Sequence, residues 1–98
     1  MTLRETVEMM LSGDYKERFI AEYVQLKIRY EKLKAYNNRI EAANATRSCY
    51  PIVALVEEPP HDCPAEMLRE QQQVMGNLLH LLEIRAVIEK IDISEVTV

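Results

Sequence analysis

The sequence predicts an all-α protein: an antiparallel pair of long helices preceded by a short N-terminal helix. Apolar residues recur at helical spacing through residues 14–45 and again through residues 63–91, and a proline-containing segment, residues 46–62, separates the two stretches. The chain has only two glycines, whereas an all-β fold needs many tight turns. A length of 98 residues corresponds to one domain, residues 1–98.

The first helix is expected over residues 2–12. Thr2 and Glu5 have the spacing of a capping box, in which the hydroxyl and the carboxylate each accept a hydrogen bond from a backbone N–H at the helix start. Gly13 is expected to end the helix. One face of this helix is apolar and carries Leu3, Val7, Met10 and Leu11.

The second helix is expected over residues 14–45, with Asp14 as its N-cap. Its inward positions alternate by four and three residues: Phe19, Tyr23, Leu26, Tyr30, Leu33, Asn37, Ile40 and Asn44. No glycine or proline interrupts them, so a helix of about 30 residues and about 45 Å is expected. Asn37 and Asn44 either pair across an interface and fix its register, or face water.

The linker, residues 46–62, cannot continue this helix because it contains Pro51, Pro59 and Pro60. Its apolar run, residues 52–56, predicts a segment that covers a hydrophobic surface or pairs as a short strand. The tail, residues 91–98, alternates loosely and is the natural partner in the second case. Short β segments in the linker and the tail therefore remain open.

The third helix is expected over residues 63–91, and its second half is apolar around most of its circumference. One partner helix cannot cover so wide a surface, so we expect a homo-oligomer, by default a dimer, with a larger cyclic or dihedral assembly as the alternative. Gly76 costs about 1 kcal/mol relative to Ala in mid-helix, which close approach of a neighbouring backbone would explain. The expected interface comprises Met75, Gly76, Leu78, Leu79 and Leu82.

The charge distribution argues against nucleic-acid binding. Residues 15–47 carry eight Lys or Arg and four Glu, a net charge of +4, and the whole chain is −4, so the remainder carries −8. Binding to a nucleic-acid duplex usually requires a dominant basic surface. No hydrophobic signal core or membrane-length apolar run is present, so we expect a cytoplasmic protein without membrane contact, with Cys49 and Cys63 reduced.

Catalysis and metal binding are not expected. His61, Cys63 and Cys49 form one close pair of soft ligands plus a distant thiol, whereas structural zinc takes four ligands, usually as two close pairs. Cys63 near a helix N-terminus is a conceivable nucleophile, but neither an orienting group nor an oxyanion hole accompanies it. Two glycines cannot form a Gly-rich phosphate loop. We therefore expect no enzyme activity, no metal and no cofactor.

The candidate ligand-binding residues are Arg29, Lys32, Tyr36 and Arg39, which share one helix face at offsets of three, seven and ten. Two guanidiniums, an ammonium and an aromatic ring suit a phosphate and a stacked base, while the alternative is a solvated or salt-bridged face. Arg85 is the fifth candidate. It shares an apolar stripe of the third helix and needs either an anionic ligand or a carboxylate partner, most simply Glu89.

Two blocks resemble a family of small helical proteins of gut-bacterial phages and prophages, named after a crAss-like phage gene product. The first block is residues 14–19 with Glu22, Tyr23 and the stretch 26–33. The second block comprises Asp62-Cys63-Pro64, Leu68, Glu70-Gln71, Met75-Gly76, Leu79, Leu82-Glu83, Arg85-Ala86, Ile88-Glu89 and Ile91-Asp92. Together they cover roughly two thirds of the chain. The linker matches the variable part of the family, and the end of the tail has no match.

The resemblance implies a phage or prophage accessory protein acting in a bacterial host cell, and it assigns no activity or functional residues. At the level of architecture alone, the chain is also similar to helical-hairpin phage proteins that sequester cyclic-nucleotide immune signals between subunits. Two hypotheses follow. The first is an oligomer that sequesters a cyclic nucleotide or an ADP-ribose-type signal, and the second is a protein-binding inhibitor or adaptor of a host protein.

Overall fold

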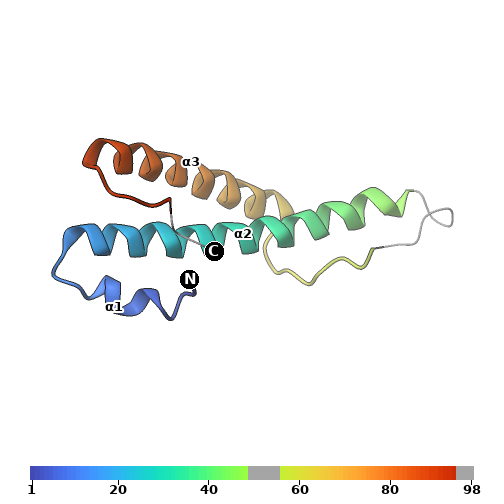
Figure 1. Cartoon of the computed structure of the whole chain (residues 1–98). Coiled ribbons are helices and arrows are strands. Elements are labelled where there is room, and N and C mark those ends of the chain that lie inside the picture. The colour runs from blue at the N-terminus through green and yellow to red at the C-terminus, as the bar shows by residue number, and fades with distance from the viewer. Residues whose placement is uncertain (49–55, 95–98) are drawn as a thin grey trace.

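The computed structural model describes residues 1–48 and 56–94, and it is all-helical as predicted. Its elements are α1 (Thr6–Met10), α2 (Tyr15–Arg47) and α3 (Ala65–Glu89). Figure 1 shows α2 as the central element, with α3 antiparallel along one side and α1 along the other. The molecule measures 57 × 25 × 24 Å, because 33 helical residues at about 1.5 Å each give α2 a length of about 50 Å.

The described residues contain no strand. Residues 52–55 and 95–98, where the alternative of short β segments was centred, lie outside them. Ile91 is buried in the hydrophobic core and Ile93 packs against it, so this part of the tail serves the helical core.

The helix α1 is shorter than the predicted 2–12, because residues 3–5 form a turn before it. The predicted capping box is present in this turn: Thr2 N donates to Glu5 Oε2 at 3.0 Å, and Glu5 N donates to Thr2 Oγ1 at 3.3 Å. The fully buried Thr6 fixes α1 to α2, since its hydroxyl accepts a hydrogen bond from Gln25 Nε2 at 2.9 Å. The face of α2 around Gln25 is therefore occupied by α1.

The α2–α3 interface follows the predicted spacing of the long helix. Asp14 is the N-cap of α2 and accepts from Lys16 N at 3.0 Å. Asn37 lies in the α2–α3 interface of the single chain, where it bonds to Leu68 and Gln72, whereas Asn44 is exposed. The alternative of an interface amide therefore applies to Asn37, and the alternative of an amide that faces water applies to Asn44. The core cluster joins α2, α3 and the residue after the α3 cap: Phe19, Tyr23, Leu79, Leu82, Ala86 and Ile91.

The end of α3 is a Schellman motif with a non-glycine residue in the left-handed position. Lys90 has φ 58° and ψ 44°. The N–H of Ile91 donates to Ala86 O at 2.9 Å and that of Lys90 donates to Val87 O at 3.4 Å. This turn directs Ile91 back into the core, where it is 6% exposed.

The C-terminal part of α2 extends beyond α3, and the described part of the linker lies against it (Figure 1). Two contacts fasten this segment: Val56 N donates to Thr46 Oγ1 at 3.3 Å, and Arg47 pairs with Glu58 at 2.9 Å. Ile40 and Ala43 of α2 are buried, and so is Pro59 of the linker. Of the two predicted roles for the linker, covering a hydrophobic surface fits residues 56–63.

Candidate ligand-binding site

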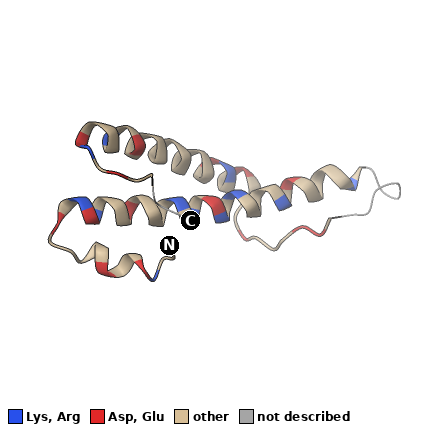
Figure 2. Cartoon of the chain, in the orientation of Figure 1, with Lys and Arg blue, Asp and Glu red and all other residues tan. Residues whose placement is uncertain are grey.

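The four predicted binding residues of α2 lie on one exposed side of the helix, which we call the cationic face (Arg29, Lys32, Tyr36 and Arg39). The three cations are exposed and Tyr36 is half-buried. Among the ion pairs of the described residues, none involves Arg29, Lys32 or Arg39. Of the alternative of a solvated or salt-bridged face, the described residues do not show the salt-bridged form, while a solvated face agrees with the exposure of the three cations. Figure 2 shows Lys and Arg residues interspersed with Asp and Glu along α2.

The cationic face borders a hollow of about 500 Å³ where the linker meets α2 and α3. We call it the Lys32 hollow, and it is lined by Lys32, Leu33, Tyr36, His61, Asp62, Cys63 and Leu68. Lys32 and Tyr36 are thus brought together with His61, whereas Arg29 and Arg39 stand outside the hollow. The sequence could not show this proximity, because it depends on the path of the linker.

His61 is positioned in this hollow by two contacts. Its Nδ1 lies 2.6 Å from the carbonyl oxygen of Cys63, and its Nε2 lies 3.6 Å from Glu58 Oε1. The hydrogen bond to the Cys63 carbonyl, and secondarily the Glu58 carboxylate, raise the pKa of His61 above its ordinary value. The hydrogen bond from Arg47 in turn lowers the pKa of Glu58. His61 therefore lies beside two carboxylates, Glu58 and Asp62, and Lys32 is the other cation of the lining.

Arg85 is not part of this site within one chain. Its Nε pairs with Glu89 Oε2 at 3.0 Å, the partner that the sequence predicted, and its guanidinium lies 5.1 Å from the centre of the Phe19 ring. It also contacts the hydroxyl of Tyr15. Phe19 precedes Lys32 by thirteen residues, about 20 Å along α2. Arg85 therefore sits at the opposite end of the hairpin from the Lys32 hollow.

A second depression, which sequence reasoning missed, lies on the other side of α2. This amide groove has a volume of about 560 Å³ between α2 and α3, and five carboxamide side chains line it: Asn37, Asn38, Gln72, Gln73 and Asn77. The sequence signals were the pair Asn37-Asn38 and the run from Gln71 to Gln73. Both can be read as ordinary polar helix surface until the antiparallel packing brings them together.

The predicted interface residues divide between the inside and the outside of the chain. Leu79 and Leu82 are buried against α2, and Met75 is half-buried, so a single hairpin uses them itself. At Gly76 a Cβ would lie 3.3 Å from Cε2 of Tyr30, so the close neighbour is an aromatic ring and not the backbone that we expected. Leu78 alone of the five remains exposed.

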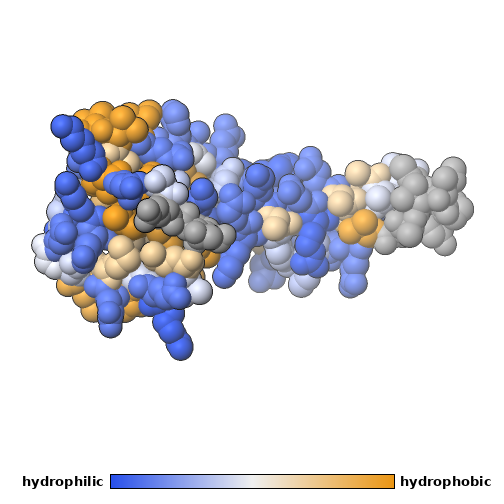
Figure 3. Space-filling view, in the orientation of Figure 1, coloured by the Kyte–Doolittle hydropathy of each residue, from blue (hydrophilic) through white to orange (hydrophobic). Residues whose placement is uncertain are grey.

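The outer side of α3 nevertheless carries a row of exposed apolar residues. We call it the α3 stripe: Met67, Val74, Leu78, Leu81 and Ile88. Figure 3 shows hydrophobic residues gathered at the end of the molecule where α1 and α3 flank α2, including the outer edge of α3. Contiguous apolar surface of this kind marks a contact site.

The fold and these surfaces define a class of protein: a small helical hairpin with depressions on two sides of α2 and an apolar outer helix face. Among the described residues, no helix has both the length and the apolar content needed to cross a bilayer. The family model described as Sequestin matches residues 13–88, so the chain belongs to the Sequestin family. No curated protein and no solved structure gives a significant match.

Proposed function

We propose that this protein is a non-enzymatic binding protein that sequesters a nucleotide-derived signal, with phosphates held on the cationic face. One observation carries the proposal. Arg29, Lys32 and Arg39 project from one side of α2 without ion-pair partners among the described residues, next to a hollow that contains Lys32 and Tyr36. Arginine and lysine bind phosphate, and tyrosine stacks on a base.

The name of the family supports sequestration of a ligand as the activity. With the phage resemblance, it favours a counter-defence protein that removes a cyclic nucleotide or an ADP-ribose-type signal in the bacterial cytoplasm. Arg29 and Arg39 are about 15 Å apart along α2, which is far for one small ligand.

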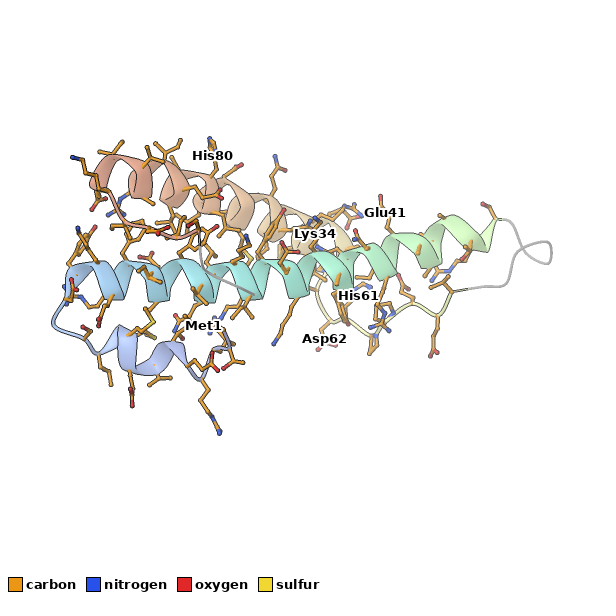
Figure 4. All side chains as sticks on the ribbon, viewed as in Figure 1. Met1, Lys34, Glu41, His61, Asp62 and His80 are labelled. Carbon is orange, nitrogen blue, oxygen red and sulfur yellow. The ribbon has the colours of Figure 1, made fainter. Side chains whose placement is uncertain are left out.

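The test is a thermal-shift and calorimetric panel of cyclic dinucleotides, cyclic trinucleotides and ADP-ribose derivatives. We expect at least one compound to bind, and Arg39→Ala to weaken it about ten-fold, the loss of one charge-assisted contact of about 1.4 kcal/mol. Lys34→Ala is the matched control, since Figure 4 shows Lys34 on the opposite side of α2 from His61 and Asp62. If no compound in the panel binds, the proposal fails.

The second candidate is a protein-binding inhibitor or adaptor of a host protein. The observation in its favour is the α3 stripe, which a lone hairpin leaves in water. Light scattering separates the candidates. A symmetric oligomer accounts for the stripe and favours sequestration, whereas a monomer at high concentration leaves the stripe for a heterologous protein.

A further inference from the structure

The amide groove contains a buried polar atom without a partner. Asn37 is 6% exposed, and its Nδ2 donates to Leu68 O at 3.1 Å and to Gln72 Oε1 at 2.9 Å. Both amide hydrogens are thus used, while its Oδ1 is buried and accepts no hydrogen bond. This leaves an acceptor unused beside the groove that Asn37 lines. The atom has almost no accessible surface, so a ligand N–H or O–H reaches it only when the side chains around it move aside.

The surroundings of this atom have the size and the polarity of a small-molecule site. The groove of about 560 Å³ falls within the range of roughly 300–1,000 Å³ typical of such sites. Asn38, Gln73 and Asn77 each offer a donor and an acceptor side by side, whereas both amide hydrogens of Asn37 are used and Gln72 Oε1 accepts one of them. The charged side chains in the lining are Arg69 and Glu41, which cancel in net charge. This arrangement matches a neutral ligand with alternating donors and acceptors along one edge.

An aromatic ring lies beside the amides. Tyr30 lines the groove, and its ring rests against α3 because Gly76 has no Cβ. Carboxamides that pair with the polar edge of a base, next to a ring that can stack on its face, are the means by which proteins recognise nucleobases. The ligand class that suits both features is a planar nitrogen heterocycle.

A separate, smaller hollow of about 240 Å³ adjoins the groove at Tyr30 and Gly76, which line both. Its charged lining consists of Lys27, Glu31 and Glu83, so carboxylates outnumber the cation. Carboxylates accept hydrogen bonds from hydroxyl groups and repel phosphates. This end therefore suits the sugar of a nucleoside and disfavours a phosphorylated group.

We propose that the amide groove binds a nucleoside, with the base against Asn37 and its neighbouring amides and the sugar hydroxyls toward Glu31 and Glu83. The site is separate from the cationic face: Figure 4 shows Glu41, which lines the groove, on the opposite side of α2 from His61 and Asp62 of the Lys32 hollow. The proposal does not depend on the function assigned to the cationic face.

The experiment titrates the intact protein with adenosine, guanosine, cytidine and uridine, and follows the side-chain amide resonances by NMR. At least one nucleoside should shift the amide signals of Asn37, Gln73 and Asn77 in a saturable way. Gln73→Ala should weaken the binding of that nucleoside about ten-fold, because the variant removes one bidentate amide contact to the base. Gln73 is exposed, so its replacement should leave the fold intact.

Gln71→Ala is the matched control, because Gln71 is an exposed glutamine of the same helix that does not line the groove. Its affinity should stay within about two-fold of the unmodified protein. The proposal is overturned if no nucleoside at millimolar concentration shifts the groove amides, or if Gln71→Ala and Gln73→Ala weaken binding equally. Nucleosides carry no phosphate, so a failure here leaves the proposal for the cationic face standing.

Discussion

Lys90 adopts a backbone conformation that favours glycine, with φ 58° and ψ 44° at the end of α3. The left-handed region costs an ordinary residue about 1–2 kcal/mol, and the Schellman motif usually places glycine there. Lys90→Gly should therefore raise the free energy of unfolding by about 1 kcal/mol, partly offset by the greater freedom of glycine in the unfolded chain. Chemical denaturation measures the gain.

Lys90→Ala is the control for this prediction, because alanine removes the lysine side chain but keeps the strain of a Cβ at positive φ. It should bring no gain in stability. An equal gain for both variants would mean that the lysine side chain, and not the backbone conformation, is the source of the cost.

The contacts of His61 with Glu58 and with the Cys63 carbonyl make this part of the linker sensitive to pH. The pKa of His61 is raised mainly by the Cys63 carbonyl and also by Glu58, so the stabilisation it provides is present below the ordinary histidine value of about 6.5 and is lost as the pH rises through its folded pKa. The Glu58 pKa is lowered, so its contribution is present above the ordinary glutamate value and is lost as the pH falls through its folded pKa. The contact is strongest between these two limits.

An NMR titration of the His61 ring tests this. The pKa should lie above 6.5, the ordinary value, and Glu58→Gln should move it downward, because the variant removes the negative charge 3.6 Å from Nε2. Amide exchange of the linker backbone, corrected for its intrinsic rise with pH, should accelerate over the same pH range in which His61 loses its proton. An unchanged pKa in the variant would show that Glu58 has no influence on the ring.

At the scale of the elements, α1 depends on its contacts with α2. A five-residue helix is too short to be stable alone, and it is held by Thr6, whose hydroxyl donates to Leu3 O at 2.6 Å and accepts from Gln25. Thr6→Val keeps the shape but removes both hydrogen bonds, so it should cost about 1–2 kcal/mol. Hydrogen exchange should rise in residues 3–10 and stay unchanged in α3. Equal acceleration in both helices would contradict a local role for Thr6.

The helical elements themselves could be predicted because their spacing is a local property of the sequence. The residues from Phe19 to Ile40 that recur at alternating spacings of four and three were correctly predicted to lie on the inward side of α2. The prolines of the linker indicated where this helix has to end. Lys90 could not be anticipated as a helix terminator, since the usual signal is glycine or asparagine. Its left-handed turn forms because it allows Ile91 to enter the core.

The packing partner of each face was harder to predict than the face itself. Nearly the whole circumference of α3 is apolar after Val74, so periodicity could not tell which of Leu78 and Leu82 would face α2. The structure buries Leu82 to 2% exposure and leaves Leu78 in the α3 stripe. The amide groove was missed for the same reason, since its residues come from two helices whose mutual register the sequence does not specify.

For the whole molecule, the remaining question is what covers the α3 stripe. The core of a single chain does not bury the α3 stripe. Leu81, for example, is 56% exposed although it belongs to a row of apolar residues with heptad-like spacing from Val74 to Ile88. Burying such a row against a second copy removes apolar surface from water at about 25 cal/mol per Å². A symmetric pair of hairpins packed through α3 is therefore the assembly that we expect.

Leu81→Glu tests this expectation by placing a charge in the middle of the stripe. The variant should be monomeric by light scattering at concentrations where the unmodified protein is a dimer or larger. It should remain folded, because Leu81 is more than half exposed. Val87→Glu is the matched control: Val87 is 80% exposed, and it lies six positions on, about 120° around the helix from Leu81. That variant should keep the assembly. Either of two results would show that copies of the chain do not meet through this stripe. In the first, the unmodified protein stays monomeric even in a sample about 100-fold more concentrated than the one used to compare the variants. In the second, both variants disrupt the assembly equally.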